Sequence, residues 1–198
     1  MSAALLNPFA TCRTRPGAIE YLFPEGIGVD DLVERLKRND WREEIIGPHG
    51  SGKTTLLMTL LPALKRRAGA VALHRLASDG RLHPARVLAL LRGSRGARLV
   101  AIDGFEQLGG AARTLVRAWC RLRGKGLIVT GHRPMGLPGI YRTRVSRELA
   151  GRIVARLAGG RHSLIHPSDV DAALARHATN LREALFTLYD VFEDRSHT

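Results

Sequence analysis

Short apolar runs recur along the chain, and each is followed by a glycine or polar break and then by a longer stretch with apolar residues at helical spacing. Four runs lie at 43–47 (EEIIG), 70–76 (AVALHRL), 98–103 (RLVAID) and 126–131 (GLIVTG), with a fifth at 139–146 (GIYRTRVS). Runs of this length, bounded by turn residues, are typical of buried strands.

The stretches between these runs predict helices at 54–67, 83–93, 110–123 and 147–157. Strands that alternate with helices form a parallel sheet with helices on both faces. The pattern therefore predicts an α/β three-layer sandwich around a mostly parallel sheet of about five strands.

The start of the chain has a different character. Residues 1–28 contain three prolines and the aromatic residues Phe9, Tyr21 and Phe23, so we expect an irregular lead-in packed on the core through these aromatic anchors. A helix follows at 29–38 (VDDLVERLKR), with acids in its first turn and bases in its last, as the helix dipole favours.

The end of the chain predicts two further helices, near 167–177 and 180–193. We therefore expect a core over 29–160, followed at 161–198 by a short, lid-like helical segment.

The composition is that of a globular protein, because 44% of the 198 residues are hydrophobic and can bury one sizeable core. No stretch approaches the roughly 18 uninterrupted apolar residues of a membrane helix, and the N-terminus lacks a secretory pattern. Cys12 and Cys120 lie far apart and match neither a disulfide framework nor a zinc spacing. We therefore expect a protein of the reducing cytoplasm without a membrane partner.

The charge is strongly positive, with 31 basic against 18 acidic residues and a net charge of +13. All but four of the basic residues are arginines, and they are spread along the chain. A GC-rich genome produces the same bias through its codons. The charge therefore permits a nucleic acid or another polyanion as a partner without requiring one.

The segment GPHGSGKT at 47–54 matches the phosphate-loop pattern G-x-x-x-x-G-K-[ST], between an apolar strand and an apolar helix. Its glycines let successive N–H groups point at phosphate oxygens, and the helix that follows aims its positive end at the same anion. Lys53 should reach the β- and γ-phosphates, and the Thr54 hydroxyl should coordinate Mg²⁺. The pattern predicts a P-loop NTPase with nucleotide-binding residues Gly47, Pro48, His49, Gly50, Ser51, Gly52, Lys53, Thr54 and Thr55.

The segment LVAIDGFEQL at 99–108 ends a buried strand in an acid, Asp103. A carboxylate at this position of the sheet is typical of a Walker B segment and would hold Mg²⁺. Glu106, three residues later, would orient the attacking water or accept its proton.

With LIVTGHRP at 127–134, these motifs resemble the P-loop ATPases of the AAA+ and STAND groups over roughly residues 30–190. DGFEQ resembles the NACHT-type Walker B, although Gln107 stands where that pattern has an acid. VTGHRP resembles the sensor 1 segment with one residue inserted. The resemblance implies ATP as the nucleotide and Arg133 as the residue that senses the γ-phosphate, with His132 and Thr130 as competitors.

The segment ATNLREALFTLYD at 178–190 resembles the sensor 2 helix of AAA+ proteins, which places Arg182 on the nucleotide. The resemblance also leaves Arg142 and Arg144 as candidates for an arginine finger supplied to a second copy of the chain. The C-terminal helical part is short for a complete AAA+ lid, and no effector domain is present in the sequence.

These observations favour a Mg²⁺-dependent ATPase or nucleotide switch, with a second copy of the chain or a separate protein as its partner. In this hypothesis Glu106, Arg133 and Arg182 are catalytic, and Thr54 and Asp103 hold the metal. Two alternatives stay open. One is a small-molecule or nucleoside kinase, which explains DGFEQ and TGHRP poorly. The other is an ATP-dependent module that binds DNA or protein without appreciable hydrolysis.

Overall fold

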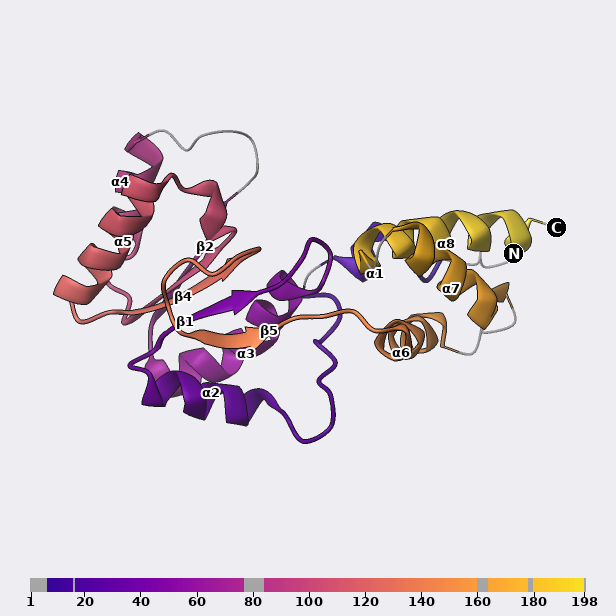
Figure 1. Ribbon diagram of the computed structural model, residues 1–198, viewed down its shortest axis with the longest axis horizontal. Coiled ribbons are helices and arrows are strands. Elements are labelled where there is room, and N and C mark those ends of the chain that lie inside the picture. The colour runs from indigo at the N-terminus through magenta and orange to yellow at the C-terminus, as the bar shows by residue number, and fades with distance from the viewer. Residues whose placement is uncertain (1–6, 16, 77–83, 160–163, 178–179, 198) are drawn as a thin grey trace, which may run out of the picture. The chain divides into compact units, whose positions relative to one another are not determined.

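The computed structural model describes residues 7–15, 17–76, 84–159, 164–177 and 180–197 (Figure 1). The chain divides into two compact units, which we call the sheet unit and the helical unit. The sheet unit comprises Phe23–Gly47 and Leu56–Arg142, and the helical unit comprises Met1–Leu22, Pro48–Thr55 and Thr143–Thr198.

The sheet unit contains five strands, all parallel to their neighbours, in the order β2-β3-β4-β1-β5. This arrangement confirms the predicted α/β class and the parallel sheet. The strands are β1 (Arg42–Ile46), β2 (Val71–Arg75), β3 (Leu99–Asp103), β4 (Gly126–Gly131) and β5 (Gly139–Arg142).

The last strand is shorter than its predicted run at 139–146. Its partner β1 ends at Ile46, which pairs with Arg142, so no ladder is available beyond that residue. β4 in the middle of the sheet is buried along its whole length, as the continuous apolar run at this position predicts.

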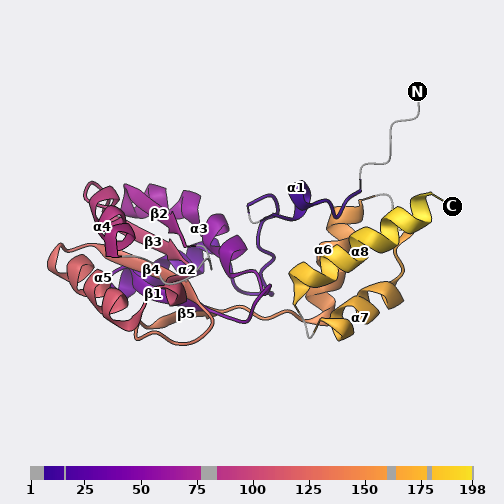
Figure 2. The same ribbon diagram turned by 90° about the horizontal axis from the view of Figure 1, so that it is seen from above.

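Helices cover both faces of the sheet. Helices α2 (Val29–Arg38) and α3 (Lys53–Ala68) lie on one face, and α4 (Pro84–Gly93) and α5 (Gly110–Leu122) lie on the other (Figures 1 and 2). α2 spans the predicted range, and its first turn is capped by the side chain of Asp31, which accepts a hydrogen bond from the Gly28 N–H at 2.8 Å. A cluster of buried apolar side chains from α4, β3, α5 and β4 fills the second interface.

The strand order makes β1 the switch point of the sheet. The chain leaves β1 for the far edge at β2, returns through β3 and β4, and then crosses to β5 on the other side of β1. In open parallel sheets, ligands bind outside the carboxyl ends of the strands at such a point. The phosphate loop follows directly on β1 in the sequence, as this rule requires.

The helical unit contains α1 (Thr11–Thr14), α6 (Arg147–Ala158), α7 (Pro167–Arg176) and α8 (Leu181–Ser196). The last three match the helices predicted from the sequence, whereas α1 was not predicted. The aromatic residue Phe9 is fully buried among α6, α7 and α8, and its ring meets that of Phe192 edge-on at 6.3 Å. Asn7 fixes this lead-in by donating to the carbonyl oxygen of Tyr189 at 2.9 Å.

The predicted domain boundary at 160/161 lies outside the described residues. Within the part of the chain that the structure describes, no helix is long and apolar enough to cross a membrane.

Candidate nucleotide site

The backbone of the phosphate loop adopts conformations that its glycines allow. Gly50 and Gly52 adopt φ values of +67° and +91°, a left-handed region that residues with a Cβ rarely occupy. Helix α3 then begins at Lys53, so the N–H groups of its first turn lie at the end of the loop. The local sequence thus produces the curled, donor-rich loop that the motif predicts.

The polar side chains of the loop turn back onto its own backbone. The Lys53 ammonium donates to the carbonyl oxygen of Pro48 at 2.7 Å, and the Ser51 hydroxyl donates to the same oxygen at 2.8 Å. Ser51 Oγ also lies 2.6 Å from Thr143 Oγ1, in a pair of hydroxyls that are both nearly inaccessible. Lys53 itself is only 9% exposed. A buried cation beside a loop rich in N–H donors is an arrangement that suits an anion.

Two further residues of the helical unit lie against the glycines of the loop. A Cβ on Gly50 would lie 1.7 Å from Asn180 Oδ1, and a Cβ on Gly52 would lie 3.2 Å from Cε2 of Tyr21. Asn180 is also the N-cap of α8, because its side chain accepts from the Glu183 N–H at 3.5 Å. Sequence reasoning named neither residue as part of the site, nor Thr143. Of these three residues, only Asn180 lies in a recognisable sequence motif, as the first residue of the N-x-R-E segment.

In the sheet unit, the hydroxyl of Thr130 at the end of β4 holds the acid at the end of β3. Thr130 Oγ1 donates to Asp103 Oδ1 at 2.7 Å and accepts from the Gly104 N–H at 2.9 Å. Gly104 has a φ of +80°, and a Cβ there would lie 2.9 Å from the carbonyl oxygen of Leu76. The glycine after Asp103 is therefore needed for the turn that leads into the short helix η1 (Phe105–Gln107).

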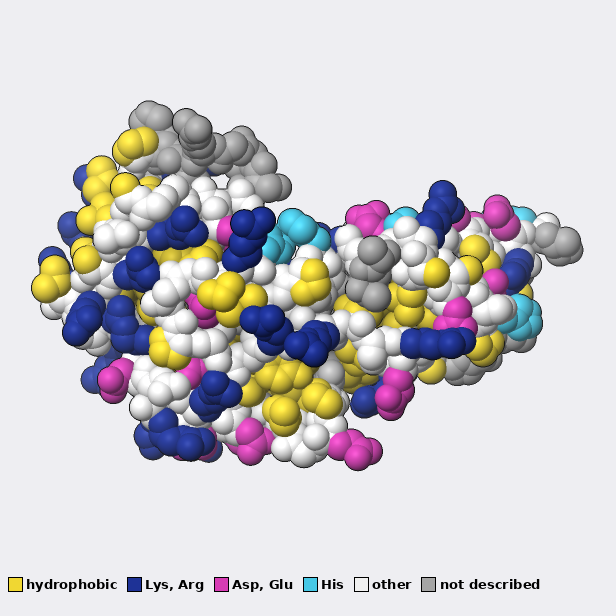
Figure 3. Space-filling model, viewed as in Figure 1, with side chains coloured by type: hydrophobic (Ala, Val, Ile, Leu, Met, Phe, Trp, Pro, Cys, Tyr) yellow, Lys and Arg dark blue, Asp and Glu magenta, His cyan; other side chains and the backbone are white. Residues whose placement is uncertain are grey.

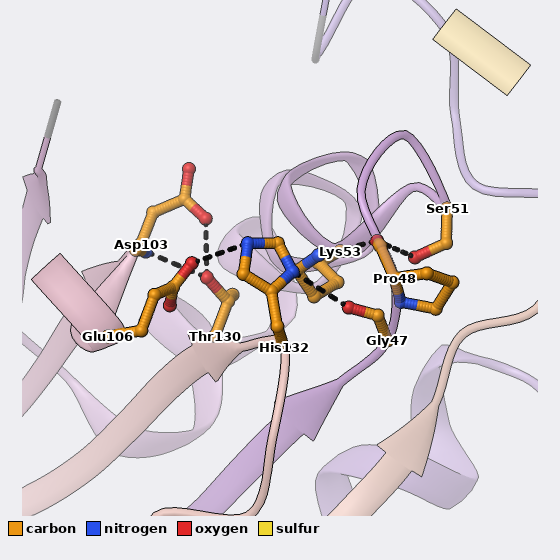
Figure 4. A network of polar contacts seen from close by, with 9 residues as sticks. Gly47, Pro48, Ser51, Lys53, Asp103, Glu106, Thr130 and His132 are labelled. Atoms are coloured by element: carbon orange, nitrogen blue, oxygen red, sulfur yellow. Dashed lines mark hydrogen bonds and ion pairs between the residues drawn. The ribbon is translucent and has the colours of Figure 1, made fainter. Parts of the chain in front are cut away.

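A second side chain after β4, His132, contacts the second acid. His132 Nε2 lies 2.9 Å from Glu106 Oε1, and Nδ1 lies 3.2 Å from the carbonyl oxygen of Gly47 (Figure 4). The Gly47 N–H donates to the carbonyl oxygen of Gly131 at 3.1 Å. The first residue of the phosphate loop is thus held on both sides by the end of β4.

The loop after β4, which carries Arg133, is anchored by a buried acid of β1. Glu44 Oε2 accepts from the Met135 N–H at 2.8 Å, and Arg117 donates to the Met135 carbonyl oxygen at 2.7 Å. Burial raises the pKa of Glu44, while hydrogen bonds from the Met135 and Leu137 backbone and the charge of Arg117 oppose that rise. Glu44 therefore has a structural role, because its carboxylate holds the loop that follows β4.

The remaining candidates occupy more open positions. Arg133 is exposed in the sheet unit, and Arg182 is exposed in the first turn of α8 in the helical unit. Pro48 and His49 are exposed in the loop, whereas Thr54 and Thr55 are half-buried at the start of α3. The sheet unit therefore brings Asp103 and Glu106 together with β4, and the helical unit gathers the loop with Tyr21, Thr143 and Asn180.

Comparison with known proteins gives matches only among solved structures. No family model matches the sequence, and no curated protein matches it. The replication initiator DnaA bound to AMPPCP and single-stranded DNA matches with a TM-score of 0.57 at 16% identity. A DNA replication initiation factor matches with a TM-score of 0.57 at 15% identity.

These matches cover 87% and 89% of this chain but only 63% and 66% of the two matched chains. The fold is that of the AAA+ P-loop ATPases. The resemblance inferred from the motifs is confirmed for the fold, which is all that a likeness at these identities shows. The finer likeness to the STAND, NACHT-like group stays a prediction.

Proposed function

We propose that this protein binds ATP with Mg²⁺ and hydrolyses it, as an ATPase or nucleotide switch. The observation that carries the proposal is the phosphate loop, in which a nearly inaccessible Lys53 and two left-handed glycines form a donor-rich curl. This loop follows in sequence on β1, the strand at the switch point of the parallel sheet. The DnaA structure of the same fold carries the nucleotide analogue AMPPCP.

The loop fits the phosphates of a nucleotide. Lys53 and Ser51 both donate to the carbonyl oxygen of Pro48 in the same loop. A phosphate oxygen is charged and therefore a stronger acceptor, so it would replace this carbonyl oxygen. A side chain at Gly50 would clash with Asn180, and one at Gly52 would press against Tyr21, so both glycines are needed for this loop. The residues 47–55 would therefore bind the phosphate chain, with the β- and γ-phosphates at Lys53.

The residues proposed for Mg²⁺ also fit that ion, because the Thr54 hydroxyl and the Asp103 carboxylate are oxygen donors. In the described ranges, no group of three or more His, Cys, Asp and Glu side chains forms a metal site of its own. Mg²⁺ bound with nucleotide needs only one or two protein ligands beside phosphate oxygens and water. Thr130 would orient Asp103 for this role, since it already donates to Oδ1.

Glu106 is the candidate that would orient the attacking water. Its Oε1 faces His132, and its Oε2 is buried with no hydrogen-bond partner among the described residues. An orphaned carboxylate oxygen is costly, and the carboxyl group would have to turn before either oxygen could accept from the attacking water. Arg133 and Arg182 would stabilise the charge on the transferring phosphoryl group.

The test measures two quantities separately. Equilibrium binding of ATP with and without Mg²⁺ is followed by calorimetry, and phosphate release is followed across a range of protein concentrations. We expect Mg²⁺-dependent binding, and a specific activity that rises with concentration if Arg142 or Arg144 of a second copy completes the site. Glu106→Gln should retain binding and lower turnover by about 100-fold. An absence of ATP binding would disprove the proposal.

A second candidate function is binding of single-stranded DNA under control of ATP. The DnaA structure binds single-stranded DNA, and this chain carries a net charge of +13. On the face shown in Figure 3, Lys and Arg side chains are spread over many elements and do not form one patch. Titration of a labelled oligonucleotide at several salt concentrations tests this candidate, and a steep salt slope that ATP changes would support it.

A further inference from the structure

The solvent side of α5 carries an apolar stripe. The core side of this helix is the one that holds its buried residues, Val116 and Cys120. A surface helix normally carries polar residues on its other side, where a stripe recurs every three or four positions. In α5 the exposed residues of one such stripe are all apolar: Ala111, Leu115, Ala118 and Leu122. Leu115 is 49% exposed, and Leu122 is 86% exposed.

Helix α4 extends this apolar surface. It lies beside α5 on the same side of the sheet (Figures 1 and 2). Leu88 of α4 is 48% exposed, and Ala89 next to it is exposed as well. Single leucines on a surface are ordinary, whereas apolar side chains gathered on neighbouring elements mark an interaction site. We call this surface the α4–α5 face; its apolar members are Leu88, Ala89, Ala111, Leu115, Ala118 and Leu122.

The charge of the α4–α5 face is entirely positive. Neither helix contains an Asp or a Glu, and the exposed residues Arg92 and Arg121 lie in their last turns. Figure 3 shows hydrophobic and basic side chains together over these two helices. The guanidinium group stays charged at any physiological pH. A matching surface therefore combines an apolar side chain with negative charge.

Helix α8 of the helical unit has this complementary character. It contains four acids and two bases, in a chain whose net charge is +13. One of the two bases, Arg195, is already paired with Asp169 of α7 at 2.6 Å. The exposed stripe of α8 places one aromatic side chain among three acids: Glu183, Phe186, Asp190 and Asp194. An aromatic side chain on an exposed helix face is the commonest kind of anchor in protein interfaces.

We propose that the α4–α5 face of one copy of the chain binds α8 of a second copy. Phe186 inserts among the leucines, and the acids of α8 lie against Arg92 and Arg121. Alternating alanine and leucine suits a helix as the occupant, because the alanines let its backbone approach while the leucines fill its grooves. A flat lipid surface does not need this alternation, and nucleic-acid phosphates do not need leucines. The contact joins two different surfaces, so copies associate head to tail.

Sedimentation of the full chain without nucleotide measures this contact independently of any ATPase activity. We expect a mass that rises with protein concentration, with a dissociation constant of about 10 µM, because one helix on two helices is smaller than a standard interface. Added salt should weaken the association, since it screens charges at a surface. A parent protein that stays monomeric at about 100 µM would overturn the proposal.

Two double variants separate the two surfaces. Leu115→Gln/Leu122→Gln alters the α4–α5 face and keeps α8, whereas Phe186→Gln/Asp190→Lys alters α8 and keeps the face. All four side chains are exposed, so the substitutions spare the core. Each variant alone should associate at least about tenfold more weakly than the parent. Mixed together they should form a one-to-one complex with the parental affinity, because the intact α8 of the first meets the intact face of the second. This complex also shows that both variants are folded.

The controls make the same types of change elsewhere. Ile27→Gln and Glu25→Lys, at exposed positions before α2, should leave association unchanged. If two α4–α5 faces bound each other instead, the α8 variant would associate normally and the mixture would form no one-to-one complex, which would overturn the proposal. A monomeric parent that sediments with phosphatidylglycerol vesicles, and loses this binding in Leu115→Gln/Leu122→Gln, would also overturn it by assigning the face to a lipid surface.

Discussion

The phosphate loop and the strand-end acids are built on different principles, although both are parts of the candidate site. In the loop, Lys53 and Ser51 bond to a backbone oxygen of the same loop, and two left-handed glycines set its shape. After β3, each acid is held by a side chain from the end of β4 or just after it: Asp103 by Thr130 and Glu106 by His132. The loop is local in sequence, whereas the acids depend on the pairing of β3 with β4.

The difference shows which part of the site tolerates change. A loop that depends on backbone geometry is sensitive to any added Cβ and to loss of its single cation. An acid that depends on one partner side chain loses only one hydrogen bond when that partner is altered, which costs about 1 kcal/mol. We therefore expect the largest effects in the loop and smaller effects at the strand ends.

The largest effect should come from Lys53→Ala. This change removes the buried cation of the loop, and with it two or more charge-assisted hydrogen bonds to phosphate. We expect the affinity for Mg-ATP, measured by calorimetry, to fall by at least about 100-fold. Lys65→Ala, at an exposed position near the end of the same helix, is the matched control and should bind normally. Retained affinity in Lys53→Ala with an unchanged fold would remove the phosphate-loop assignment.

The next effect should come from Gly50→Ala. The left-handed φ of +67° costs an alanine about 1 kcal/mol. The new Cβ also displaces Asn180, the N-cap of α8, for roughly another 1 kcal/mol. We expect chemical denaturation to show a free energy of unfolding that is lower by about 2 kcal/mol.

The double variant Gly50→Ala/Asn180→Ala should lose less stability than the sum of its single variants, because the clash is gone. Additive losses would contradict the contact between the loop and α8. Gly151→Ala is the control in the same unit, since its Cβ meets nothing within 4 Å inside helix α6. It should raise stability by roughly 1 kcal/mol.

Much of the fold could be predicted from the sequence because its signals are local. Apolar runs separated by glycines marked all five strands, and the motif 47–54 marked the loop. The end of β5 was predicted too late, because the length of a strand depends on its partner, and β1 ends at Ile46. The short helix α1 was missed for a similar reason, since Phe9 beside it packs against α6–α8 far along the chain.

The site was predicted less completely than the fold. Asp103 and Glu106 were identified from their distance to the end of a strand, and the structure places both beside β4. Their partners were not identified, because a threonine and a histidine after an apolar run have many roles. Only the register of β3 with β4 brings Thr130 to Asp103. The contacts of Tyr21, Thr143 and Asn180 with the loop are equally non-local.

A smaller effect than that of Gly50→Ala should come from Thr130→Val, which removes a hydroxyl at nearly constant volume. Asp103 Oδ1 and the Gly104 N–H would both lose the hydrogen bond to this hydroxyl. We expect the Mg²⁺ concentration for half-maximal nucleotide binding to rise about fivefold, equivalent to ~1 kcal/mol. Binding of ATP without Mg²⁺ should not change. Thr130→Ser keeps the hydroxyl and should behave as the parent protein, so equal behaviour of the two variants would exclude the role of this bond.

The smallest effect should come from Glu44→Gln, which tests whether the loop after β4 depends on a buried charge. Burial raises the folded-state pKa of Glu44 above its unfolded value near 4.5. Between those two values the folded protein binds more protons than the unfolded chain, so stability falls as the pH rises. The glutamine does not titrate. We therefore expect the parent protein to lose stability relative to Glu44→Gln across this window, by at most about 1 kcal/mol in denaturant titrations. A difference that is constant with pH, or that has the opposite slope, would show that the Met135 and Leu137 hydrogen bonds outweigh burial.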